Sequence, residues 1–215
     1  MAFCNNLKPE RSPGNISGNP LHGLCERVCI QAKKVFDACL SQTTHENVVV
    51  TLRDLCPPNP TPPLTFVSAA STSSHGKVKD VSIDPIPDRP NCKRVQATVC
   101  IPIEVVYTDS CGREGVGQGE LCFTKDVVLN VPDNSVIPVK VAATVNVVSP
   151  MGTWISGHTF SLTVCVTILL KIEAEVELLI PSYGYCFIPP CQEFSAEACS
   201  GIFDLPLFPT GKCCV

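Results

Sequence analysis

Every second residue of Ser161–Ile180 is apolar, and this alternation restricts the fold more than any other feature of the chain. The even positions are Leu, Val, Ile or Ala throughout, whereas the odd positions include Lys171 and three glutamates. A period of two is typical of a β-strand with one buried and one solvated face. A membrane helix would have to bury the lysine and the glutamates, each at a cost of about 2.5–3.5 kcal/mol. We therefore expect no membrane span, and because strands are usually shorter, a bend or a break near Leu169–Leu170.

The same alternation recurs along the chain and predicts the fold class. It is strong in Arg94–Thr108 and Val139–Val148. Shorter candidate strands are Val48–Arg53, Leu64–Ala69, Val78–Ile83, Gly115–Phe123 and Asp126–Val131. Many short strands separated by turn residues favour an all-β protein, an antiparallel β-sandwich or jelly roll. We assign residues 46–181 to this domain.

One stretch before the strands has the spacing of a helix. In Leu24–Leu40, apolar residues recur at steps of three and four, which predicts a helix with one apolar face, and we assign residues 21–45 to a helical segment. Its cysteines are Cys25, Cys29 and Cys39. Cys29 and Cys39 have two readings, as small core residues on the apolar face or as functional thiols.

Composition excludes some partners. The 215 residues suffice for one substantial core, and with a net charge of −4 and 17% charged residues the chain has no basic field for nucleic acid. No nucleophile elbow, metalloprotease helix, dinucleotide fingerprint, phosphate loop or Cys-x-x-Cys pair occurs, and the four histidines lie in separate loops. We therefore predict no catalytic residues, no metal ligands, no cofactor and no enzymatic activity.

The cysteine content is the anomaly of the composition. There are fifteen, an odd number, so at least one thiol stays free or pairs outside the chain. The N-terminal sequence MAFCNNLKPERSPGN has no apolar region typical of a secretory signal. Two explanations remain open: the protein is oxidised after leaving the cytosol by another route, or its thiols hold metal.

Both chain ends lack strand periodicity and carry cysteines. Residues 1–20 contain Cys4 among prolines and glycines, and residues 182–215 form a cysteine-rich tail that ends in Cys213 and Cys214. Neighbouring cysteines pair poorly with each other. We therefore expect two extended arms, with Cys4, Cys213 and Cys214 as candidates for disulfides to other subunits. The apolar residues expected to dock the C-terminal arm are Phe203, Leu205, Leu207 and Phe208.

Three cysteines lie on the polar phase of the predicted strands. Cys100, Cys122 and Cys165 alternate with apolar neighbours, whereas a buried free cysteine is expected on the apolar phase. We predict that these thiols face outward and are bonded or covered by an arm.

A short segment resembles a known group of proteins. Arg27–Cys39, RVCIQAKKVFDAC, is similar to a phrase in spore-coat-associated proteins of endospore-forming anaerobic bacteria. The chain also resembles the cysteine-rich, β-rich coat, exosporium and appendage proteins of their spores. The resemblance implies jelly-roll-like subunits made in the mother-cell cytoplasm without a signal peptide, placed on the spore surface and then locked by disulfides.

The sequence thus favours a self-assembling structural subunit of a spore surface layer or filament. Its expected partners are further copies of itself, joined by arm exchange and disulfides, with other spore-surface proteins as further candidates. The alternative is a thiol-rich metal-binding or redox-buffer module, which a metal assay on protein purified under reducing conditions would distinguish.

Overall fold

The structure is a computed structural model that describes residues 18–22, 24–90, 92–133 and 135–186. All regular elements of these residues are strands: β1 (Glu26–Thr51), β2 (Arg53–Cys56), β3 (Thr65–Ser71), β4 (His75–Pro85), β5 (Cys92–Thr108), β6 (Glu114–Asn130), β7 (Lys140–Ser156) and β8 (Thr159–Ser182). Antiparallel pairing joins β5 to β3, β4 and β6, joins β7 to β3, β4 and β8, and joins β2 to β6. This confirms the all-β, antiparallel class. The jelly-roll connectivity stays a prediction. Among the described residues, no helix is long and apolar enough to cross a membrane.

The chain divides into two compact units. One contains residues 33–176, and the other contains residues 1–32 together with 177–215. The first unit therefore begins within β1 and ends within β8, and it contains all of β2–β7. The described part of the second unit consists of the start of β1, the end of β8 and the residues beside them.

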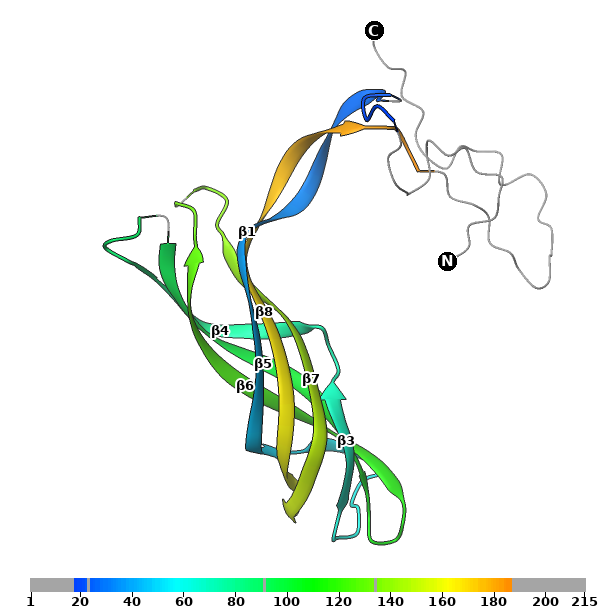
Figure 1. Ribbon diagram of the computed structural model, residues 1–215. Helices are drawn as coiled ribbons and strands as arrows, with labels where there is room; N and C mark the ends of the chain where they lie inside the picture. The colour runs from blue at the N-terminus through cyan, green and yellow to red at the C-terminus, as the bar shows by residue number, and fades with distance from the viewer. Residues whose placement is uncertain (1–17, 23, 91, 134, 187–215) are drawn as a thin grey trace, which may run out of the picture. The chain divides into compact units, whose positions relative to one another are not determined.

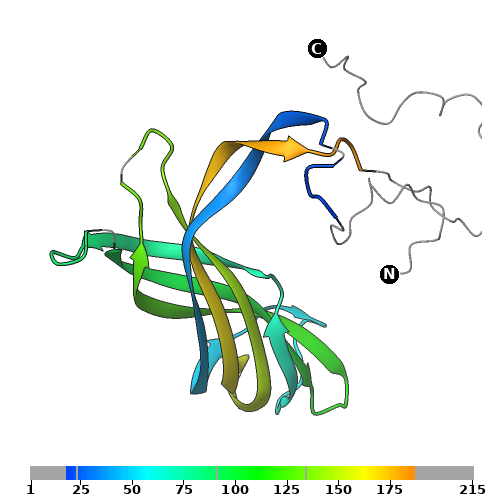
Figure 2. The ribbon, with the colours of Figure 1, turned by 45° about the horizontal axis from the view of Figure 1, so that its top comes forward.

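The strands form one sheet in the order β1-β8-β7-β3-β5-β6-β2, and β4 pairs with both β5 and β7 (Figure 1). Strands β3 and β4 follow each other along the gap between β7 and β5, because each pairs with both of these strands. Figure 2 shows β1, β8 and β7 side by side. The long strands β5 and β8 thus have a paired neighbour on both edges.

The predicted alternation matches the buried faces of the sheet. In β8, the even positions from Phe160 to Ala174 are buried, and the strand continues through Leu169–Leu170 without the predicted break. In β5, the odd positions from Val95 to Tyr107 are buried, and all of them except Ala97 belong to one core cluster with residues of β8. Burying one such aliphatic side chain contributes about 1.5–3 kcal/mol, so these two faces supply much of the core.

Side chains of β1 lie against β6, although the two strands are far apart in the sheet order. The Asp37 carboxylate accepts a hydrogen bond from the backbone N of Asn130 at 2.7 Å, and the Lys125 Nζ donates to the Ser41 hydroxyl at 2.9 Å. The ring centroids of His45 and Phe123 are 4.8 Å apart. These contacts require the sheet to curve around its core.

The predicted helix over Leu24–Leu40, and with it the helical segment 21–45, is wrong. From Glu26 onward these residues belong to β1, which pairs with β8. The backbone N of Cys25 donates to the carbonyl of Ser182, and the hydroxyls of Thr51 and Thr159 lie 3.1 Å apart at the other end. A strand satisfies the main-chain groups along the edge of β8, which a helix cannot do. Tertiary pairing therefore overrides the helical spacing.

Three glycines of β6 allow other strands to approach closely. A Cβ on Gly115 would lie 2.8 Å from the Tyr107 ring, and one on Gly119 would lie 2.6 Å from Cγ2 of Val50. A Cβ on Gly117 would meet Leu52 at 2.9 Å. Gly117 and Gly119 thus make room for the end of β1 and the residue that follows it, and Gly115 makes room for the Tyr107 ring of β5.

We predict that Gly119→Ala lowers the free energy of unfolding by about 1–3 kcal/mol, because the added methyl overpacks a buried β-branched neighbour. In the double variant Gly119→Ala/Val50→Ala the clashing methyl is gone, so the total loss should be smaller than the sum of the single losses. Urea unfolding at fixed redox conditions measures both effects. Additive losses would contradict the close approach of Val50.

Candidate functional site: the exposed cysteines

Six of the described cysteines are exposed and unpaired, and they are the main chemical feature of the surface. They are Cys25, Cys29, Cys56, Cys111, Cys165 and Cys186. Cys39 and Cys92 are half-buried, and Cys100 and Cys122 form a disulfide. The predicted arm residues Cys4, Cys213, Cys214, Phe203, Leu205, Leu207 and Phe208 lie outside the described residues.

The smaller unit carries three exposed thiols on a two-stranded ribbon, made by the start of β1 and the end of β8. Among the described residues of this unit these are Cys29 in β1, Cys25 just before β1 and Cys186 after the end of β8. The Cys25 thiol donates to the carbonyl of Ser182 at 3.4 Å, and the Tyr183 hydroxyl donates to the carbonyl of Pro20. Large apolar side chains are exposed on the same unit: Leu21, Ile30, Leu178 and Leu179. A two-stranded ribbon has marginal stability by itself, so this unit would gain from a covering partner.

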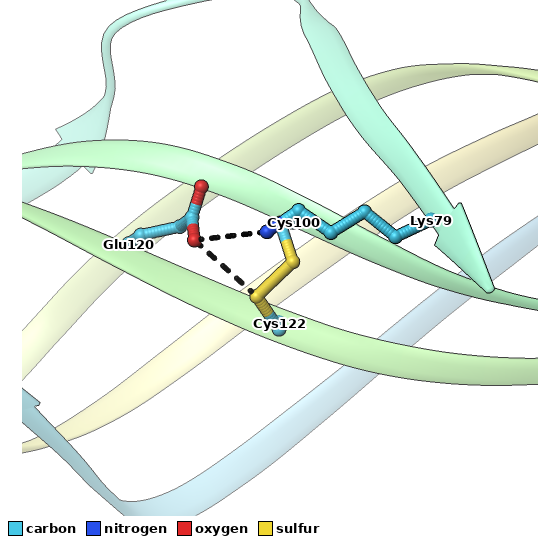
Figure 3. The surroundings of a disulfide bond; sticks show 4 residues. All are labelled: Lys79, Cys100, Glu120 and Cys122. Atoms are coloured by element: carbon cyan, nitrogen blue, oxygen red, sulfur yellow. Dashed lines mark hydrogen bonds and ion pairs between the residues drawn. A yellow bond between two sulfur atoms is a disulfide. The ribbon is translucent and has the colours of Figure 1, made fainter.

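Two of the three cysteines predicted to face outward bond to each other. Cys100 of β5 and Cys122 of β6 are directly opposite in an unbroken antiparallel register, and their sulfurs form a disulfide (Figure 3). Cys122 is exposed, as the polar phase predicts, whereas Cys100 is only 1% exposed. The sequence placed both on the same face but did not show that they would pair.

The third, Cys165, is exposed on β8 and has no disulfide partner among the residues that the structure describes. Its sulfur lies 4.0 Å from the Thr44 hydroxyl of β1. It lines a shallow hollow together with Gln42, Thr43, Thr44, Val166 and Thr167. Hydroxyl groups and a thiol line this hollow, and its lining residues include no acid–base pair.

Cys39 differs from the exposed thiols in its surroundings. It packs against the core, in line with the core reading, whereas Cys29 is exposed. Burial raises the pKa of the Cys39 thiol, and the negative charge of Asp37 raises it further, although Lys125 acts in the opposite direction. Because the thiolate is the reactive form, Cys39 should react more slowly than the exposed cysteines.

Cys111 lies in the turn between β5 and β6, and a buried carboxylate holds this turn. One oxygen of Asp109 accepts from the backbone N atoms of Cys111 and Arg113 at 2.9 Å each. The other oxygen pairs with the Arg113 guanidinium and accepts from the backbone N of Thr61. These hydrogen bonds to Arg113, Thr61 and Cys111 lower the pKa of Asp109, against the opposing effect of burial. The carboxylate thus joins the hairpin tip to the loop between β2 and β3, which contains Thr61.

Sequence reasoning missed Asp109 and gave no role to Cys56, Cys111 and Cys186. The signal for Asp109 was present: an aspartate two residues before Cys111 and three before a glycine is typical of a turn in which the side chain caps its own backbone. No signal in the sequence indicated that Thr61, 48 residues away, would share the same carboxylate.

Comparison with known proteins gave no match to any family model, curated protein or solved structure.

We predict that acid weakens the fold through Asp109. Its pKa is lowered in the folded state, so its stabilising contribution is complete above the unfolded value of about 3.9 and is lost as the pH falls through the folded value. Asp109→Asn should lower stability at neutral pH and reduce the loss of stability on acidification. Urea midpoints measured from neutral pH to about pH 3 test this. Asp88→Asn, at an exposed turn, is the control and should leave the acid dependence unchanged.

Proposed function

We propose that this protein is a self-assembling structural subunit whose assemblies are locked by disulfides between subunits. The observation that carries the proposal is the ribbon of the smaller unit. It exposes Cys25, Cys29 and Cys186 beside large apolar side chains, among them Leu179 at 66% exposure. Apolar contact would bring subunits together reversibly, and oxidation of thiols at that contact would make the association covalent.

The larger unit supports the same role. Its core is an antiparallel sheet with long strands, and it carries further exposed thiols at Cys56, Cys111 and Cys165. Exposed thiols at the end of β2, in the β5–β6 turn and on β8 would allow each subunit to bond to more than one neighbour. Such connectivity is what a layer or filament requires.

The proposed location is the surface of a bacterial spore, in the coat, the exosporium or an appendage. The support for this location is the resemblance of Arg27–Cys39 to spore-coat-associated proteins. In this proposal the chain is made in the mother-cell cytoplasm, and oxidation follows after its placement on the spore. The arms with Cys4, Cys213 and Cys214 add bonds to neighbouring subunits, and the run from Phe203 to Phe208 docks the C-terminal arm first.

We predict that the full-length protein, purified with reductant and then oxidised in air, forms regular assemblies visible by negative-stain microscopy. These assemblies should resist denaturant without reductant. Serine at Cys4, Cys213 and Cys214 should leave assemblies that form but dissolve in denaturant alone. A denaturing gel without reductant shows the difference as the loss of the high-mass ladder.

Two further variants locate the bonds. Serine at Cys25, Cys29 and Cys186 tests the ribbon, and Cys39→Ser is the control because its thiol is half-buried. If the arm variant keeps the wild-type ladder and the ribbon variant loses it, the bonds lie on the ribbon and not on the arms. If oxidised wild-type protein stays monomeric at all concentrations, the structural-subunit proposal is wrong.

A second candidate function is metal binding by reduced thiols, and one observation favours it. A sulfur of Cys100, a sulfur of Cys122 and a carboxylate oxygen of Glu120 lie within 4.8 Å of one another. Two thiolates and a carboxylate are suitable zinc ligands and leave one position of a tetrahedral site open. The disulfide would have to be reduced first, because zinc binds thiolates.

Under this alternative, protein purified under reducing conditions should contain zinc. The double variant Cys100→Ser/Cys122→Ser should contain about one equivalent less than wild type. Elemental analysis measures the content, and Cys165→Ser is the matched control. Equal zinc content in the double variant and in wild type would exclude a site at these residues.

A further inference from the structure

The two cysteines of the disulfide between β5 and β6 differ in exposure. Cys100 is 1% exposed, whereas Cys122 is exposed. The register explains the difference. Cys100 is opposite Lys77 of β4 on one side and Cys122 on the other, so both edges of β5 are covered there. On β6, the partner strand β2 is paired only at Val116 and Gln118, which leaves Cys122 beyond the covered part of the edge.

Unequal access decides the direction of thiol–disulfide exchange. An incoming thiolate attacks one sulfur of a disulfide and expels the other, and access selects the sulfur that is attacked. Here Cys122 is the exposed residue of the pair, so its sulfur is the one expected to be attacked. A bond would form between the incoming sulfur and Cys122, the bond between Cys122 and Cys100 would break, and Cys100 would leave as a thiolate that takes a proton from water. The step needs no oxidant, because the disulfide is exchanged and not created.

Two charged groups lie next to the sulfur that would be attacked. An oxygen of Glu120 is 3.7 Å from the Cys122 sulfur, and the Lys79 Nζ is 3.5 Å from the same oxygen (Figure 3). The contact with Glu120 is not a hydrogen bond in the oxidised protein, since a disulfide sulfur carries no hydrogen. The Glu120 carboxylate should repel an approaching thiolate, and the Lys79 ammonium should reduce this repulsion. Both side chains are partly exposed, at 50% and 39%, so water screens the effect to a modest size.

We propose that Cys122 is an acceptor site for thiol–disulfide exchange, with Cys100 as the leaving group and the Glu120–Lys79 pair setting the rate. The reacting partner is a thiolate, supplied by a small-molecule thiol or by an exposed cysteine of a second copy of this chain. The second source rests on the proposed function, whereas the first does not. In either case the incoming thiol replaces Cys100 as the disulfide partner of Cys122.

The first experiment uses the full-length oxidised protein at low concentration with reduced glutathione as the probe. After acid quenching and alkylation, site-resolved mass spectrometry should find glutathione on Cys122 and the alkyl label on Cys100. Glutathione on Cys100, or on neither cysteine, would overturn the proposal. In Cys122→Ser the remaining Cys100 thiol should stay slow to alkylate under native conditions, and rapid labelling there would contradict the difference in access.

Charge variants test the role assigned to the ion pair. Glu120→Gln should raise the rate of glutathione addition about threefold, and Lys79→Gln should lower it by a similar factor. Glu104→Gln is the matched control, because Glu104 lies on the neighbouring strand β5 and bonds to Gln118 at 2.7 Å. It should leave the rate unchanged. Equal rates in all four proteins would remove the electrostatic part of the proposal.

A second experiment distinguishes the source of the thiolate. Concentrated protein without glutathione is partly reduced and then incubated without oxidant, and cross-linked peptides are identified by mass spectrometry. A peptide of Cys122 joined to an exposed cysteine of another copy supports exchange between subunits. If glutathione adds to Cys122 but no such peptide forms, exchange with a second copy is wrong and the small-thiol form stands. Because microscopy of the assemblies is a separate measurement, failure of the exchange and failure of the proposed function are distinguishable.

Discussion

The structure depends on the burial of two long strand faces, one from β5 and one from β8, in a single core. Each strand contributes a row of alternate apolar side chains, and Tyr107 and Phe160 are stacked within the same cluster with their ring centroids 6.2 Å apart. Because both strands are paired along both edges, their main-chain groups are satisfied while these faces are withdrawn from water. The remaining strands complete the sheet around these two.

This arrangement leaves most of the described cysteines on the surface. Apart from Cys100, the buried positions of β5 and β8 are occupied by aliphatic and aromatic residues, and the cysteines of these strands are on the opposite phase. The exposed thiols therefore contribute little to the packing of the subunit, and they remain available for bonds. Cys39 is the contrasting case, because its packing against the core and the raised pKa of its thiol favour a structural role.

The position of the disulfide follows from the register of β5 and β6. Cross-strand neighbours on β5 and β6 place two sulfurs and the Glu120–Lys79 ion pair in one small area, and only one of the two cysteines is exposed. The same group of residues is used by the exchange proposal and by the metal-binding alternative, in different oxidation states. Redox conditions therefore decide which chemistry this area can perform.

The sequence by itself determined the strands that have one buried and one solvated face, because apolar and polar residues alternate along such strands. It therefore predicted β5, β7 and β8 and the outward phase of Cys100, Cys122 and Cys165. Only the tertiary structure decided that Leu24–Leu40 is largely strand, because this depends on the pairing of these residues with an edge of β8. It also decided that Cys100 pairs with Cys122 across 22 residues and that only one of them is covered. Register and edge coverage bring together residues that are distant in the chain, and local spacing carries no information about them.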